Sequence, residues 1–94
     1  AQDPFVETED YRKVLEFKEL LPKVRKAAGE RRRMDEDSLT YIIGLDSLYY
    51  GGYNAAGDYF RALGQMEKSR EYWGAALAKK MKLAERQYIE SKIR

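Results

Sequence analysis

The amino-acid sequence predicts an all-α protein, a compact antiparallel bundle of three to four helices. Apolar residues recur at three- and four-residue intervals along most of the chain, which is the spacing of one helix face. No segment alternates apolar and polar residues as a half-buried strand does. The 94 residues, 44% of them hydrophobic, suffice for one domain with a modest core. We expect an extended lead over residues 1–7 and a single bundle domain over residues 8–94.

The first helix is expected to begin near residue 8, where Thr8 is a suitable N-cap. Pro22 either kinks this helix or opens a separate helical turn over residues 23–28. Gly29 is the expected stop, because glycine readily adopts the left-handed conformation that ends many helices. The expected buried stripe consists of Tyr11, Val14, Leu15, Leu20 and Leu21.

Three acidic residues at positions 35–37 predict the start of a second helix, since negative charge is favourable at a helix N-terminus. Gly51-Gly52 is where we expect this helix to bend or break. A short helix should follow over residues 53–63 and end at Gly64, and the longest helix should run over residues 67–93. The expected buried side of this last helix consists of Tyr72, Trp73, Ala76, Leu77, Ala84 and Tyr88.

The composition excludes several classes of function. The chain has no cysteine and no histidine, which removes zinc sites, thiol chemistry, disulfides and histidine acid–base catalysis. The net charge of +2 does not indicate a nucleic-acid binder, and no apolar run approaches the ~20 residues that span a bilayer. The acidic clusters at 7–10 and 35–37 lack the spacing of a calcium loop and are explained by helix starts. We expect no enzyme activity, no metal and no cofactor.

Two groups of residues are candidates for binding a partner. Adjacent arginines at positions 31–33 offer bidentate contacts to carboxylates, although three neighbours on one element cannot all face the same partner. Tyrosines crowd the segment 41–64, and their apolar rings with polar tips suit half-buried surfaces and interfaces. The candidate partner-binding residues are Arg31, Arg32, Arg33, Tyr49, Tyr50, Tyr53 and Phe5.

Residues 53–77 carry a pattern of bulky and small positions formed by Tyr53, Ala56-Gly57, Phe60, Gly64, Ser69, Trp73 and Ala76. This order resembles one tetratricopeptide repeat, in which small residues let two antiparallel helices touch. A generic close-packed helical hairpin explains the same residues. The resemblance implies an adaptor for protein–protein interaction, with further repeats outside these 94 residues.

A second resemblance covers more of the chain. It is carried by Gly44-Leu45-Asp46-Ser47-Leu48, Gly52-Tyr53-Asn54-Ala55-Ala56-Gly57 and the first-helix segment 7–28 with Leu20-Leu21-Pro22. The first two stretches resemble the "LNAL…YNxxG" turn of lumenal assembly factors of photosystem II. The third resembles the first helix of the Q-type oxygen-evolving-enhancer proteins. The chain lacks the proline-rich turn of the former and is shorter than the latter, so the branch stays open.

This resemblance to small helical extrinsic proteins of photosystem II implies a non-catalytic accessory subunit. Its partner would be a larger membrane protein complex made of photosystem subunits, met from the thylakoid lumen. The subunit would be peripheral to the membrane, with no transmembrane span and no nucleic-acid partner. Ala1 fits a processed N-terminus as well as a trimmed one.

Overall fold

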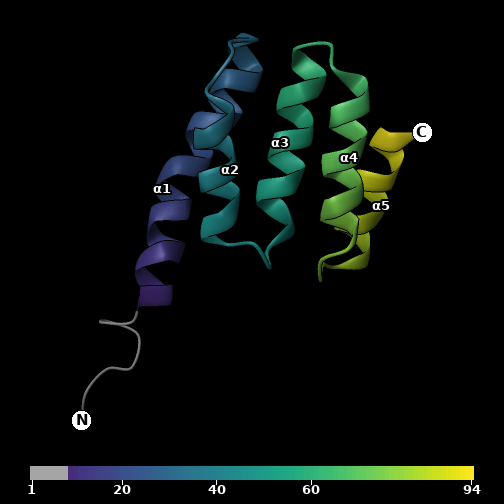
Figure 1. Cartoon of the computed structure of the whole chain (residues 1–94). Helices are drawn as coiled ribbons and strands as arrows, with labels where there is room; N and C mark the ends of the chain where they lie inside the picture. The colour runs from purple at the N-terminus through teal and green to yellow at the C-terminus, as the bar shows by residue number, and fades with distance from the viewer. Residues whose placement is uncertain (1–8) are drawn as a thin grey trace.

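The computed structural model describes the backbone of residues 9–94 and the side chains of residues 11–94. This part of the chain forms five helices and no strand: α1 (Glu9–Glu30), α2 (Glu36–Leu45), α3 (Tyr50–Ala62), α4 (Met66–Leu77) and α5 (Leu83–Ile93). Successive helices run antiparallel, with α3 between α1 and α4 and with α5 against α4 (Figure 1). The all-α class is confirmed, whereas the number of helices exceeds the predicted three to four. The predicted lead and Phe5 lie outside the described residues.

α1 is one helix that continues through Pro22. Pro22 is exposed, so water can reach the backbone carbonyl that it leaves unpaired one turn earlier. The buried face of α1 consists of Phe17, Leu21, Val24 and Ala27. Two members of the predicted stripe, Tyr11 and Leu15, are instead 39% and 47% exposed. The predicted stripe therefore included two exposed residues, Tyr11 and Leu15, and left out the buried Phe17.

The predicted stop at Gly29 is wrong, since this glycine lies inside α1. The helix ends with the left-handed residue Arg31, whose φ is 53°. The N–H of Arg32 donates to the carbonyl of Ala27 (2.9 Å), and the N–H of Arg31 donates to that of Ala28 (3.2 Å). This pair of bonds is a Schellman motif, which usually places glycine at the left-handed position.

α3 ends with the same motif, and there the left-handed residue is glycine. The N–H of Gln65 donates to the carbonyl of Phe60 (2.9 Å), and that of Gly64 donates to Arg61 (3.0 Å). Gly64 has a φ of +80°, so its predicted role as a helix stop is confirmed. The chain thus holds two equivalent helix ends, one with the preferred glycine and one with Arg31.

The connection between α2 and α3 comes earlier than predicted. α2 begins with the expected acidic cap, because the carboxylate of Asp35 accepts hydrogen bonds from the backbone N–H (3.0 Å) and the hydroxyl (3.2 Å) of Ser38. The chain breaks over residues 46–49, so Gly51-Gly52 lies in the first turn of α3 and does not end a helix. A Cβ on Gly52 would lie 3.2 Å from the Phe17 ring, which shows how closely α3 approaches α1 there.

The predicted helix over 67–93 is wrong, because α4 and α5 are separate and antiparallel (Figure 1). The chain reverses over residues 78–82, where Lys80 forms an isolated parallel bridge with Tyr49. The reversal changes which residues face inward after the break. Ile89 is buried, whereas Tyr88 is 63% exposed and Ala84 is also exposed, contrary to prediction.

α3 and α4 share the most extensive contact of any two helices, which confirms that the hairpin over 53–77 is the tightest part of the fold. Trp73 and Ser69 of α4 are fully buried. The hydroxyl of Ser69 donates to the carbonyl of Gly57 (2.7 Å). The indole of Trp73 lies directly against Gly57, so that a Cβ there would stand 2.8 Å from its Cγ and nearer still to Cδ1 and Nε1.

Gly57→Ala should destabilise the protein by about 1–3 kcal/mol, because the added methyl group collides with a buried indole that has no room to move. Chemical denaturation followed by circular dichroism measures the change. The matched control is Gly74→Ala, since a Cβ on Gly74 meets nothing within 4 Å and alanine favours helix by about 0.5–1 kcal/mol. Equal effects of the two substitutions would contradict the close contact between α3 and α4.

Candidate functional site

The three predicted tyrosines lie where α3 begins, and they mostly serve packing. Tyr49 stands edge-on to Phe17 with the ring centroids 5.9 Å apart, and it is 4.9 Å from the ring of Tyr50. Tyr53 is half-buried, with the ammonium of Lys79 5.1 Å from the centre of its ring. Tyr49 keeps 40% of its surface exposed, so it is the member of the group that is most open to a partner.

Tyr50 is the most perturbed of these tyrosines. Burial is the largest influence, followed by the neighbouring Tyr49 and by a hydrogen bond to the Glu85 carboxylate. Together these raise the pKa of the Tyr50 phenol to about 12. The neutral phenol therefore links α3 to the start of α5, which is a structural role.

The predicted arginines separate into two surfaces and do not meet the tyrosines. They lie in the connection between α1 and α2, at the opposite end of α3 from Tyr50 (Figure 1). Arg32 and Arg33 line a cavity between α1 and α2. Arg31 lines a different cavity, which is formed with α3 and α5. The expectation that three adjacent arginines cannot serve one partner together agrees with this arrangement.

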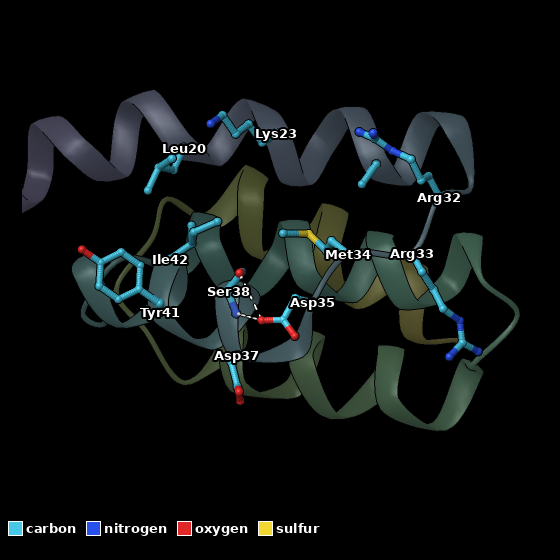
Figure 2. A pocket seen from close by; sticks show the side chains of 11 residues that line it. Leu20, Lys23, Arg32, Arg33, Met34, Asp35, Asp37, Ser38, Tyr41 and Ile42 are labelled. Carbon is cyan, nitrogen blue, oxygen red and sulfur yellow. Dashed lines mark hydrogen bonds between the residues drawn. The ribbon is translucent and has the colours of Figure 1, made fainter.

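The α1–α2 cavity has a volume of about 570 Å³ and is lined by Leu20, Lys23, Ala27, Arg32, Arg33, Met34, Asp35, Asp37, Ser38, Tyr41 and Ile42. Figure 2 shows Asp35 bound to Ser38, and the side chain of Arg33 extending away from the other lining residues. Arg32 pairs with Glu30 at 3.5 Å. One of the three cations of this cavity, Arg32, is therefore paired with a carboxylate of the chain itself.

The second cavity, which we name the α1–α3–α5 groove, has a volume of about 500 Å³. Its lining comprises Ala28, Gly29 and Arg31 from the end of α1, Asp58, Arg61 and Ala62 from α3, and Tyr88 and Lys92 from α5. Three of these side chains are cationic and one is acidic. Arg31 and Arg61 are both exposed. No carboxylate among residues 11–94 forms an ion pair with either of them.

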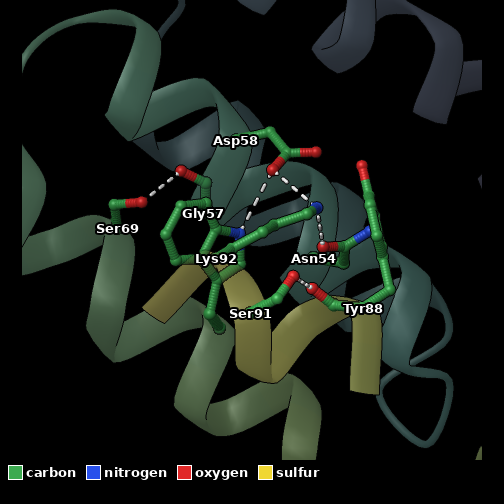
Figure 3. Close-up of polar contacts among 8 residues, drawn as sticks. Asn54, Gly57, Asp58, Ser69, Tyr88, Ser91 and Lys92 are labelled. Carbon is green, nitrogen blue, oxygen red and sulfur yellow. Dashed lines mark hydrogen bonds and ion pairs between the residues drawn. The ribbon is translucent and has the colours of Figure 1, made fainter. Parts of the chain in front are cut away.

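The acidic residue of the groove, Asp58, is already engaged. Its Oδ1 accepts from the ammonium of Lys92 (3.0 Å) and from the indole Nε1 of Trp73 (3.2 Å). The same ammonium donates to the Oδ1 of Asn54 (2.8 Å), as Figure 3 shows. Lys92 is largely buried, with 8% of its side chain exposed, and its ammonium lies 4.4 Å from the centre of the Tyr88 ring.

No sequence pattern indicated a binding role for the groove residues Asp58, Arg61, Tyr88 and Lys92. Lys92 and Asp58 are 34 positions apart, and they meet only because the chain reverses over residues 78–82. A continuous helix over 67–93 would have carried Lys92 away from α3. No local pattern in the sequence marks this long-range contact.

The described residues include no group of three or more acidic side chains placed to hold a metal ion. Within the same part of the chain, none of the five helices has the length and apolar character needed to cross a bilayer. Comparison with family models, with curated proteins and with solved structures found no match.

Tyr50 provides a test of this arrangement at high pH. Its pKa is raised in the folded state, so its contribution to stability is complete below pH 10 and is lost as the pH rises towards 12. The difference in free energy of unfolding between the native protein and Tyr50→Phe should therefore shrink over this range. Urea denaturation at a series of pH values measures it, and a constant difference would contradict the burial of Tyr50.

Proposed function

We propose that this protein is a non-catalytic docking module that binds an acidic segment of a partner protein in the α1–α3–α5 groove. The helices form two hairpins, α1–α2 and α3–α4, and α5 packs mainly against α4. Lys92 of α5 also donates to Asn54 and Asp58 of α3, and residues of α1, α3 and α5 line the groove. This arrangement supports the adaptor predicted from the tetratricopeptide-like pattern of residues 53–77.

The observation that carries the proposal is the backbone conformation of Arg31. A left-handed conformation costs a residue with a Cβ about 1–2 kcal/mol, and glycine escapes this cost. The equivalent end of α3 uses Gly64, and the chain places Gly29 only two residues before Arg31. A strained residue at a position that favours glycine points to a role for its side chain. That side chain lines the groove.

The charge of the groove indicates the chemistry of the ligand. Because Asp58 is neutralised by Lys92, Arg31 and Arg61 remain as cations without a carboxylate partner among residues 11–94. A guanidinium binds a carboxylate through two parallel hydrogen bonds, which fixes the orientation of the ligand as well as its position. The small residues Ala28, Gly29 and Ala62 leave room for a peptide backbone between the charged groups. An acidic peptide segment satisfies these features.

The proposal does not depend on the resemblance to extrinsic proteins of photosystem II. That resemblance would supply a partner, the acidic surface of a membrane complex met from the thylakoid lumen. It remains a prediction about where the module works. The groove is the proposed binding site, and the contribution of its residues to binding can be measured with a synthetic acidic peptide.

Arg31→Gly should separate binding from stability. Glycine relieves the left-handed backbone, so the variant should be more stable by about 1 kcal/mol. Loss of the guanidinium should weaken binding of a short glutamate-rich peptide by about tenfold, because a hydrogen bond to a charged group contributes about 1.5–3 kcal/mol. Fluorescence anisotropy of the labelled peptide measures affinity, and thermal unfolding measures stability.

Arg61→Ala should weaken binding to a similar extent, while Arg32→Ala serves as the matched control because Arg32 lines the other cavity. A peptide of the same length with lysine in place of glutamate should not bind. If Arg31→Gly and Arg61→Ala bind the acidic peptide as tightly as the native protein, the groove is not the binding site and the proposal fails.

A further inference from the structure

Two loops of the protein are joined at one end of the molecule. The α2–α3 connection and the α4–α5 connection lie at the same end, opposite the α1–α2 and α3–α4 connections (Figure 1). A parallel bridge between Tyr49 and Lys80 holds the two loops together. We name residues 46–49 and 78–83 the leucine end, because Leu48 lies in the first loop and Leu83, the first residue of α5, directly follows the second.

Leu48 is 82% exposed and Leu83 is 68% exposed, the two highest values among the large apolar side chains of the described residues. Leu48 directly precedes the bridge residue Tyr49, and Leu83 follows Lys80 by three positions. Single exposed leucines are common on protein surfaces, whereas apolar residues grouped on one surface indicate a binding region. The two leucines therefore lie at the same end of the molecule, on segments that the Tyr49–Lys80 bridge joins.

Other residues of the leucine end face the core and anchor it by packing. Met81 packs against the cluster around Trp73, and the ring of Tyr49 contacts the rings of Phe17 and Tyr50. The loops are therefore anchored while their leucines stay outside. Packing within the chain accounts for Met81 and Tyr49 but not for Leu48 or Leu83.

The leucine end carries positively charged side chains in its α4–α5 loop. Lys79, Lys80 and Lys82 all lie in the α4–α5 loop. The nearby carboxylate of Glu85 is used within the fold, because it accepts a hydrogen bond from the backbone N–H of Lys82 (3.2 Å). Within the leucine end itself the acidic residue is Asp46, which is partly buried. Lys79 lies over the Tyr53 ring, so the exposed lysines Lys80 and Lys82 give the α4–α5 side of this end its positive charge.

We propose that the leucine end docks on the surface of a lipid bilayer that carries anionic head groups. Leu48 and Leu83 would enter the boundary between head groups and acyl chains, where apolar side chains are favoured. Lys80 and Lys82 would bind the anionic head groups, and their long aliphatic stems allow the ammonium groups to stay at the polar level. This docking uses the end of the molecule away from Arg31 and is independent of the proposed peptide binding.

Co-sedimentation with lipid vesicles tests this inference on the full chain. The protein should bind vesicles of phosphatidylglycerol mixed with phosphatidylcholine, and it should not bind vesicles of phosphatidylcholine alone. Binding should weaken as salt is added, because screening reduces the attraction between lysines and head groups. The absence of binding to anionic vesicles at low salt would overturn the proposal.

Variants locate the contact. Leu48→Ser with Leu83→Ser should reduce vesicle binding at least about tenfold, since apolar burial supports insertion. Lys80→Glu with Lys82→Glu should abolish binding, because each lysine near an anionic surface contributes about fivefold. The matched control is Arg32→Glu with Arg33→Glu, which makes the same change in charge at the opposite end. Circular dichroism confirms that each variant is folded.

A second readout reports insertion directly. Leu48→Trp adds an exposed indole, and the native Trp73 is fully buried and contributes a constant background. The emission of the added tryptophan should shift to shorter wavelength on anionic vesicles. Unchanged emission, unchanged binding by the leucine variant, or loss of binding by the arginine control would each overturn the leucine end as the docking surface. Peptide binding by the leucine variant should equal that of the native protein, which keeps the two proposals distinguishable.

Discussion

The arrangement of the last three helices depends on the absence of a side chain at Gly57. Because no Cβ stands there, the indole of Trp73 lies against the backbone of α3 and places its Nε1 within reach of Asp58. The same carboxylate oxygen then accepts the ammonium of Lys92 and so attaches α5 to α3. A close backbone approach at one residue thus determines where a helix some thirty positions later can pack. Helix pairs with larger residues at the contact must stand further apart.

The binding properties that we propose for the groove follow from this contact. Lys92 serves Asp58 within the fold, and its side chain fills the space between Trp73 and Tyr88. A buried lysine without a partner would be costly, whereas this one has two oxygen acceptors and two aromatic faces. The fold thereby neutralises Asp58, the acidic residue among the described groove residues, and leaves the exposed guanidinium groups to an external carboxylate.

Sequence patterns predicted the structural features that neighbouring residues form. They did not predict features that depend on contacts between residues far apart in the sequence. The small and bulky positions of the α3–α4 hairpin and the helix stop at Gly64 could be predicted, because neighbours in sequence form them. The break over residues 78–82 could not, since no glycine or proline marks it and Lys80 is paired with the distant Tyr49. The groove depends on that break, so it was equally beyond local patterns.

The two proposals rest on residues whose type is not the one that the local backbone conformation or solvent exposure favours. Arg31 stands where the backbone favours glycine, while Gly29 stands in a helix that favours alanine. Leu48 lies in a loop and Leu83 at the first position of α5, and a polar residue at either exposed position would cost the fold nothing. A sequence that otherwise agrees with its fold departs from local preference mainly at functional sites. Packing explains Trp73, Gly57 and Lys92 completely, and it explains none of these three exposed side chains. Their positions at opposite ends of the molecule therefore argue for two separate contacts, one with a protein and one with a membrane surface.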